Sequence, residues 1–199
     1  MLDKVAVGLC KLVTGANPRW IGTEPSLNQR IYFANHTSNM DFLAIWSALP
    51  PSLRKNTHPI AAQDYWTASP TRKYLANNVF RAVLVDRHGA GRVTALRKMV
   101  AALEEGRSLI LFPEGQRVVG NGLIPFRSGL YFLAKEYSKA ELVPVWVDNL
   151  NRVLPKGEFL AVPFLSSVSF GSPIRLEEGE GRDLFLEKAR SAVQSLKPE

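Results

Sequence analysis

The chain has one cysteine, three histidines and no long hydrophobic run among its 199 residues. Cys10 stands alone, which excludes an internal disulfide and any zinc site built from several cysteines. Because His36, His58 and His88 lie far apart in the sequence, a histidine-rich metal site is not expected. No stretch has 18 uncharged apolar residues, so these residues predict no membrane-spanning helix.

Several common functional motifs are missing too. Gly115 and Gly120 have the glycine spacing of a P-loop, but Asn121 occupies the position where lysine is required. There is no G-x-S-x-G nucleophile elbow and no G-x-G-x-x-G fingerprint. A P-loop nucleotidase, a serine hydrolase with that elbow and a Rossmann dehydrogenase are therefore not indicated. No internal repeat or low-complexity tract occurs.

The formal net charge is +7, and it is unevenly distributed. The stretch 71–107 holds eight lysines and arginines against three acidic residues. Such a basic stretch favours an anionic partner, which at this point is a phosphate, a nucleic acid or an acidic membrane surface. Residues 1–14 have apolar side chains at helical spacing. They predict a short helix, packed on the core or lying in a membrane interface, and not a signal peptide.

Strands and helices are expected to alternate along the chain. Strands are predicted at 30–35, 60–64, 79–85, 108–112, 142–147 and 162–170. Helices are predicted at 37–49, 71–77, 91–105, 126–140 and 182–196. We therefore expect an α/β fold with a single domain over 1–199, whose mixed, mainly parallel sheet is flanked by helices. Its parts would be a short N-terminal segment (1–27), a core (28–175) and a C-terminal helix (176–199).

A histidine and an aspartate come together where the first expected strand gives way to a helix. Near pH 7 a neutral imidazole can accept a proton from a hydroxyl, and a carboxylate beside it fixes the tautomer and stabilises the imidazolium. His36 and Asp41 can meet only if His36 lies in the loop and Asp41 in the first helical turn, because residues five apart on a helix diverge. The alternative is that Asp41 merely favours the helix start.

Three further segments carry candidate site residues. Residues 112–117 place Glu114, Gly115 and Arg117 just after a strand, where open α/β sheets bind ligands. Arg87 follows another strand and could grip a phosphate, and Arg127 opens a helix that could add a further cation. Each segment, taken alone, is also compatible with a plain turn, a surface ion pair or a solvated arginine.

Taken together and in order, these segments resemble the glycerolipid acyltransferases, the lysophosphatidic acid acyltransferase-like family. The family's H-x4-D block appears as Asn35, His36, Ser38 and Asp41, and its arginine-ended strand as residues 80–87. Its Phe-Pro-Glu-Gly-Thr-Arg motif appears at 112–117, and its apolar strand with a central proline at 142–145. The resemblance covers roughly residues 28–175. Gln116 replaces the usual threonine, which bears on acceptor preference, and the N-terminal region is short.

The resemblance implies transfer of an acyl group from acyl-CoA or acyl carrier protein to a lysophospholipid hydroxyl, most simply that of 1-acylglycerol-3-phosphate. His36 would be the general base and Asp41 would orient it, with no acyl-enzyme, metal or cofactor. Family assignments place Arg87, Glu114, Gly115 and Arg117 around the acceptor. Since a carboxylate repels phosphate, we expect Arg87 and Arg117, together with Arg127, to hold the phosphate, and Glu114 to orient an arginine or to accept a glycerol hydroxyl.

The expected partners are the lysophospholipid, an acyl-CoA or an acidic carrier protein, and an anionic membrane surface. We expect a peripheral protein on the cytoplasmic side of the membrane, held by the N-terminal segment with Trp20 or Trp66, while Trp46 belongs to the core. Another lysolipid acceptor, such as a lyso-amino-lipid, and an acyl-CoA hydrolase are the competing enzymatic hypotheses. A basic module that binds membrane or nucleic acid would leave His36, Asp41 and Glu114 unexplained, so no nucleic acid is expected.

Overall fold

One sheet organises the protein. The computed structural model describes Gly8 and residues 17–38, 41–86, 91–118, 122–148 and 166–198. Seven strands of these residues form the sheet, in the order β1-β7-β6-β2-β5-β3-β4. Their bounds are Asn17–Trp20 (β1), Arg30–Ala34 (β2), Thr57–Ala62 (β3), Val83–Val85 (β4), Ser108–Leu111 (β5), Glu141–Val147 (β6) and Ser167–Phe170 (β7).

The strands from β6 to β4 are parallel, and β7 runs antiparallel to β6. The carboxyl ends of β2, β3, β4, β5 and β6 therefore lie along the same edge of the sheet. Pro144 in β6 lies one residue before Val145, where pairing with β7 begins, so its missing N–H costs the ladder little. This arrangement confirms the expected α/β fold with a mixed, mainly parallel sheet.

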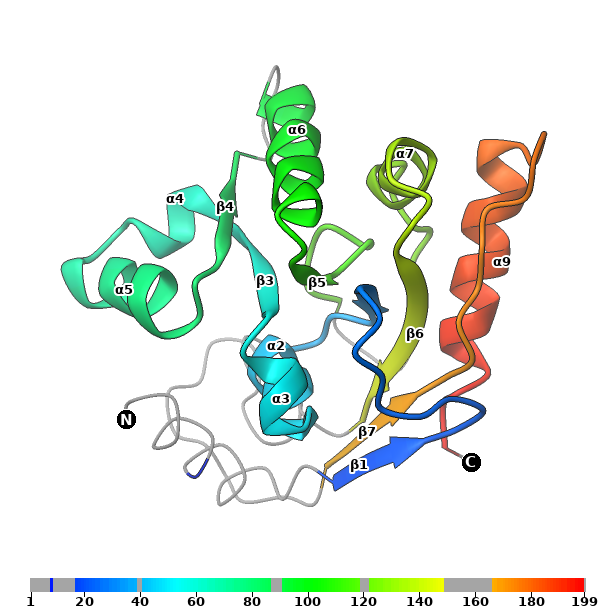
Figure 1. The fold of residues 1–199 in the computed structure, drawn as a ribbon, viewed down its shortest axis with the longest axis horizontal. Coiled ribbons are helices and arrows are strands. Elements are labelled where there is room, and N and C mark those ends of the chain that lie inside the picture. The colour runs from blue at the N-terminus through cyan, green and yellow to red at the C-terminus, as the bar shows by residue number, and fades with distance from the viewer. Residues whose placement is uncertain are drawn as a thin grey trace.

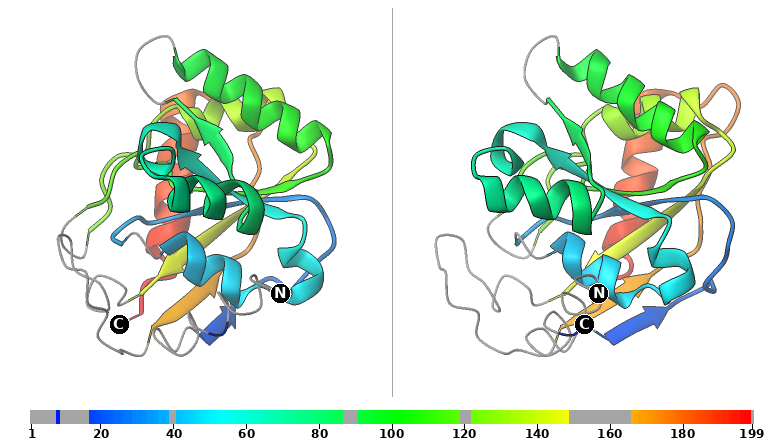
Figure 2. Two further views of the ribbon diagram at one scale, coloured as in Figure 1. Left: turned by 90° about the vertical axis from the view of Figure 1, so that its left-hand side faces the viewer. Right: turned by 60° about the vertical axis from the view of Figure 1, so that its left-hand side comes forward.

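Helices cover both faces of the sheet (Figures 1 and 2). The helices are α2 (Asp41–Ala48), α3 (Pro51–Arg54), α4 (Gln63–Trp66), α5 (Pro70–Tyr74), α6 (Gly91–Glu104), α7 (Gly129–Glu136) and α9 (Arg182–Gln194), with one π-helical turn, η1 (Leu75–Val79). Along β2 the side chains alternate: Ile31 and Phe33 pack with α6, α7 and α9, whereas Tyr32 and Ala34 pack with α2. Two hydrophobic cores therefore hold the sheet between its helices.

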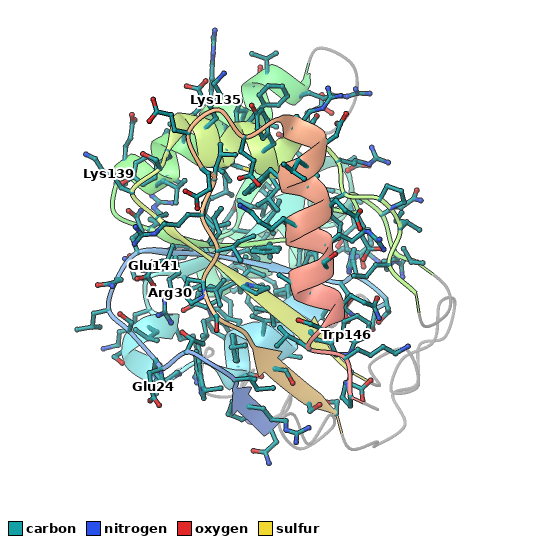
Figure 3. All side chains as sticks on the ribbon, turned by 90° about the vertical axis from the view of Figure 1, so that its right-hand side faces the viewer. Glu24, Arg30, Lys135, Lys139, Glu141 and Trp146 are labelled. Atoms are coloured by element: carbon teal, nitrogen blue, oxygen red, sulfur yellow. The ribbon has the colours of Figure 1, made fainter. Side chains whose placement is uncertain are left out.

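The amino end of β2 is held by a buried arginine. Arg30 is 4% exposed, and its Nε lies 2.8 Å from Oε2 of Glu141 on β6, while its Nη1 donates to the carbonyl of Glu24. Figure 3 shows Arg30 and Glu141 side by side, with Trp146 at the other end of β6. Burial acts to raise the pKa of Glu141, but hydrogen bonds from Asn28 and Arg30 and the charge of Arg30 outweigh it and hold that pKa below its ordinary value. The ion pair joins β2 to β6, and the bond to Glu24 fastens the segment before β2 to the sheet.

Several element boundaries differ from those expected, each for a local reason. Thr37 and Ser38 lie in the loop before α2 rather than in the helix, and their N–H groups donate to the Asp41 carboxylate. Strand β4 begins at 83 rather than 79, because Val79 belongs to η1. Helix α7 begins three residues late, since the Arg127 N–H donates to the carbonyl of Pro113.

Some expectations concern residues outside those described. The predicted helix at 1–14, except Gly8, and the first four residues of the strand predicted at 162–170 are among them. Strand β1 and the short helices α3 and α4 were not expected from the sequence. Among the described residues, no helix is both long and apolar enough to cross a membrane. Trp46 is 4% exposed and belongs to the core, as predicted.

Candidate active site

The loops after β2 and β5 bring the two main sequence motifs together. His36 follows the end of β2 and Glu114 follows the end of β5, and these strands are neighbours in the sheet. The N–H of Val118 donates to the carbonyl of His36 at 2.8 Å, which joins the two loops directly. The edge formed by the carboxyl ends of parallel strands is where open α/β sheets bind ligands.

His36 and Asp41 form the predicted pair. Nδ1 of His36 lies 2.8 Å from Oδ2 of Asp41. His36 lies in the loop and Asp41 in the first turn of α2, which is the one arrangement that allows them to meet. Because a carboxylate accepts, Nδ1 carries the proton and Nε2 is left with its lone pair. The pair can therefore act as a general base through Nε2.

Asp41 performs both of the roles that the sequence left open. Its Oδ2 also accepts the N–H groups of Thr37 at 2.7 Å and Ser38 at 2.8 Å. The bond from Ser38 satisfies a backbone N–H just before the helix, so the same carboxylate stabilises the helix start and orients the histidine. Asp41 is fully buried, and its other oxygen, Oδ1, has no hydrogen-bond partner among the described residues.

The His36 ring is held on one face by an aromatic side chain. Phe112 stacks on it with ring centroids 4.3 Å apart and planes 21° from parallel. The His36 side chain retains 22% of its exposure, so one part of the imidazole stays accessible. A ring fixed by Asp41 and Phe112 presents its free nitrogen in a defined direction, as general-base catalysis requires.

Glu114 binds the backbone of both neighbouring loops. Its Oε1 accepts the N–H of His36 at 2.8 Å, and its Oε2 accepts the N–H of Ile124 at 3.2 Å. The residue is 1% exposed. Burial raises the pKa of this carboxyl group above its ordinary value, although the two backbone N–H groups and His36 act in the opposite direction. The geometry gives Glu114 a positioning role toward His36, while direct contact with an acceptor stays a prediction.

Gly115 and Arg127 lie against each other beside Glu114. Arg127 Nε donates to the backbone carbonyl of Glu114 at 3.2 Å, so Glu114 orients this arginine through its main chain rather than its carboxylate. Gly115 has a φ of 68°, and a Cβ built on it would lie 2.5 Å from Nε of Arg127. Only glycine combines this backbone conformation with so close an approach of the arginine.

Of the other two candidate arginines, the structure describes Arg117 but not Arg87. Arg117 is half-buried on the loop after Gly115, and among the described residues its guanidinium has no hydrogen-bond or ion-pair partner. It is therefore available to an anion, as is the exposed Arg127. Arg87 lies outside the described residues, one position after Asp86.

Asn35 contributes to the site in a way that sequence reasoning missed. Its Nδ2 donates to the carbonyl of Val147 at 2.9 Å and its Oδ1 accepts the N–H of Val147 at 2.7 Å. The side chain thus continues the pairing of β2 with β6 just before His36. A buried amide next to a candidate base was the available signal, since such a group must find both a donor and an acceptor.

Comparison with known proteins gives the following matches. A family model described as Acyltransferase matches residues 21–148, which is more than half of the chain. Curated relatives named 1-acyl-sn-glycerol-3-phosphate acyltransferase are 28% identical over 179 residues in Cocos nucifera and 29% identical over 142 residues in Escherichia coli. They match 84% and 64% of this chain, which spans 56% and 53% of their own lengths. The chain thus spans about half the length of these relatives.

A solved structure resembles the whole chain. It is titled a crystal structure of the 1-acyl-sn-glycerophosphate (LPA) acyltransferase from Thermotoga maritima. The TM-score is 0.73 at 21% identity, and the match covers 100% of this chain and 79% of that one. At this identity the likeness shows a shared fold.

Proposed function

Because this chain belongs to the acyltransferase family, we propose that it moves a fatty acyl group from a thioester to the free hydroxyl of 1-acylglycerol-3-phosphate, giving phosphatidic acid. The observation that carries the proposal is the contact of 2.8 Å between His36 Nδ1 and the buried Asp41 carboxylate. The names of the curated relatives support the acceptor. The donor is proposed to be acyl-CoA or an acyl carrier protein.

The geometry supports direct transfer. Nε2 of His36 takes the proton from the acceptor hydroxyl as that oxygen attacks the thioester carbonyl carbon. The new C–O bond forms, the C–S bond breaks, and the thiolate takes the proton back from the imidazolium. Asp41 stabilises the imidazolium, because its Oδ2 already faces the protonated Nδ1. The proposal includes no acyl-enzyme, no metal and no cofactor.

We propose that Arg117 and Arg127 hold the acceptor phosphate, together with Arg87. Two of these side chains come from the loops that Glu114 joins, so the phosphate would lie beside the segment that positions His36. Guanidinium groups suit this role because they form paired, charge-assisted hydrogen bonds to phosphate oxygens.

A thiol-release assay tests the reaction. With acyl-CoA as the donor, we expect thiol release only when 1-acylglycerol-3-phosphate is added, and phosphatidic acid should accumulate in equal amount. His36→Ala should lower the rate by roughly 10² to 10⁴ or more while the fold is retained by circular dichroism. Release without an acceptor would instead indicate a hydrolase, and a preference for a lysolipid without the phosphate would exclude the proposed acceptor.

We propose that the protein works as a peripheral protein on an anionic membrane surface, at the cytoplasmic side, where its lipid acceptor would be found. Trp20 stacks on Phe170 with centroids 4.2 Å apart and is partly buried against the core, so only part of its side chain is open to a membrane. Helices α4 and α5, which project beside β4 in Figure 1, carry a surface more suited to contact with an anionic membrane than Trp20 is. Tyr65 and Tyr74 are 37% and 52% exposed there, next to Arg72 and Lys73.

This surface is connected to the site. Trp66 of α4 packs edge-on against Phe42, with centroids 5.7 Å apart, and Phe42 directly follows Asp41. Replacing Arg72 and Lys73 together by glutamine should weaken binding to vesicles with anionic lipid and leave binding to neutral vesicles unchanged. The matched control replaces two exposed cations of α6, Arg92 and Arg97. An equal loss in both double variants would contradict a localised surface.

A further inference from the structure

A cavity of about 460 Å³, open to solvent and lined mostly by exposed side chains, lies at the opposite edge of the sheet from His36. Its lining residues precede or begin three adjacent strands: Lys55, Asn56 and His58 at β3, Asn77, Arg81 and Ala82 before β4, and Glu105 and Arg107 before β5. We call this cavity the amino-end pocket. Since His36 and Glu114 follow the carboxyl ends of β2 and β5, at least the length of β5, about 13 Å, separates the two sites.

Positive charge dominates the amino-end pocket. Lys55, Arg81 and Arg107 line it against one acidic residue, Glu105, which forms an ion pair with Arg107. In the described part of the chain, the side chains of Lys55 and Arg81 have no carboxylate or other acceptor as a partner. Glu105 balances only one of the three cations, so Lys55 and Arg81 leave an excess of positive charge that a bound anion would neutralise.

The backbone around this pocket is unusual at two points. Arg81 has a φ of 49°, in a region that a long side chain rarely occupies. Asn77 belongs to η1, where the N–H of Phe80 donates to the carbonyl of Leu75 five residues earlier. Strained residues and single π-helical turns are found preferentially at binding and catalytic sites. Here both features bring side chains to the same cavity.

His58 supplies a third feature. It is 5% exposed, and its Nδ1 has no hydrogen-bond partner among the residues described. Burial lowers the pKa of its imidazole, the charge of Arg107 acts in the same direction, and hydrogen bonds to the backbone of Phe80 and Arg81 oppose them. These hydrogen bonds tie β3 to the loop that presents Arg81. Buried polar atoms without partners are rare in folded proteins and mark sites completed by a ligand or an ordered water.

We propose that the amino-end pocket binds a phosphate-bearing ligand, as a second anion site separate from the acceptor site. The pocket is of a size that suits a small molecule. Three cations on one pocket, two of them without an acidic partner among the described residues, favour a phosphate monoester or a diphosphate over a single carboxylate. The same chemistry occurs in a soluble nucleotide such as coenzyme A and in the headgroup of an anionic lipid. The inference does not depend on the proposed reaction.

Backbone amide NMR under titration with three probes tests the proposal: coenzyme A, a short-chain phosphatidic acid and inorganic phosphate. We expect saturable shifts at residues 55–58, 77–82 and 105–108, and the probe that binds most tightly identifies the source of the phosphate. Arg81→Gly removes a cation and relieves the positive φ, so it should fold at least as stably and weaken binding about tenfold or more.

Two further variants complete the design. Arg107→Gln should weaken the same shifts without relying on the backbone change, and Arg97→Gln, an exposed cation on α6, should leave them intact. The proposal fails if no probe shifts these amides, if shifts occur only around His36 and Glu114, or if both pocket variants bind as the wild type does. Because the readout is binding at named amides, failure of the proposed acyl transfer would leave this result unaffected.

Discussion

The backbone N–H of His36 lies 2.8 Å from Oε1 of Glu114, although the two residues are 78 positions apart in the sequence. The carbonyl of His36 accepts the N–H of Val118 from the same loop. Both polar groups of the His36 backbone are therefore bound by the segment after β5. The loop that carries His36 and the loop that carries Glu114 thus form one unit, so a change at Glu114 is transmitted to His36.

Glu114→Gln should lower kcat more than it raises the acceptor KM. The amide group of glutamine would point a donor at one of the two backbone N–H groups that the carboxylate now accepts, which displaces the His36 loop. A small displacement of a catalytic group can cost up to about a hundredfold in rate. Steady-state kinetics with each substrate varied measures the effect, with the exposed Glu187→Gln as control. A change in acceptor KM alone would assign Glu114 to direct substrate binding.

The same residue predicts a pH dependence of stability. Burial raises the pKa of Glu114 above its ordinary value of 4.5. The folded state therefore holds this proton more tightly than the unfolded state, and the contribution to the free energy of unfolding is complete below pH 4.5 and is lost as pH rises through the raised pKa. Denaturant unfolding of wild type and Glu114→Gln across this range measures the difference. Parallel curves for the two proteins would contradict the raised pKa.

Asp41→Asn should lower kcat by roughly 10² to 10⁴, because an amide cannot both fix the Nδ1 proton and stabilise an imidazolium. Stability should also fall by about 1 kcal/mol, since Oδ2 accepts two backbone N–H groups at the helix start. Asp183→Asn is the matched control, because Asp183 also lies in the first turn of a helix but is exposed and far from the site. Equal activity in both variants would reduce Asp41 to a capping residue.

Sequence reasoning succeeded where the determining interactions are local. Aliphatic runs and helical spacing predicted β2, β5, β6, α6 and α9 to within a few residues, because each buries its own apolar side chains. Strand β1 could not be predicted, since the polar Asn17–Trp20 segment is a strand only through its pairing with β7. The start of β4 was placed too early because η1, held by the Phe80 N–H, has no sequence signature.

The candidate site shows the same difference between local contacts, which were predictable, and long-range contacts, which were not. The proximity of His36 and Asp41 was predictable because it depends on six consecutive residues and a helix start. The partners of Glu114 were not, because they are backbone N–H groups, which every residue except proline carries. The sequence pattern therefore identified which residues gather at the site, whereas only the structure separates those that position the base from those left open to a ligand.

Gly115→Ala should impair both stability and acceptor binding. A positive φ costs an alanine about 1–2 kcal/mol, and the new Cβ would lie 2.5 Å from Arg127 Nε, which must move. Gly179→Ala separates the two effects, because Gly179 has a similar φ of 76° with no atom within 4 Å of the added Cβ. Both variants should lose a similar amount of stability by thermal unfolding, but only Gly115→Ala should raise the acceptor KM. An unchanged KM would mean that Arg127 does not bind the acceptor.

Arg117→Gln and Arg127→Gln should each raise the KM for 1-acylglycerol-3-phosphate by about tenfold or more and leave the KM for the acyl donor nearly unchanged, because a charge-assisted bond to phosphate is lost. Monoacylglycerol, which has the same acyl chain and no phosphate, should be a poor acceptor for the wild type, and neither variant should make it poorer. Arg97→Gln on α6 controls for the general loss of positive charge. If the variants impair both acceptors equally, then these arginines support the loop around Gly115 rather than the phosphate, and the phosphate must be held elsewhere.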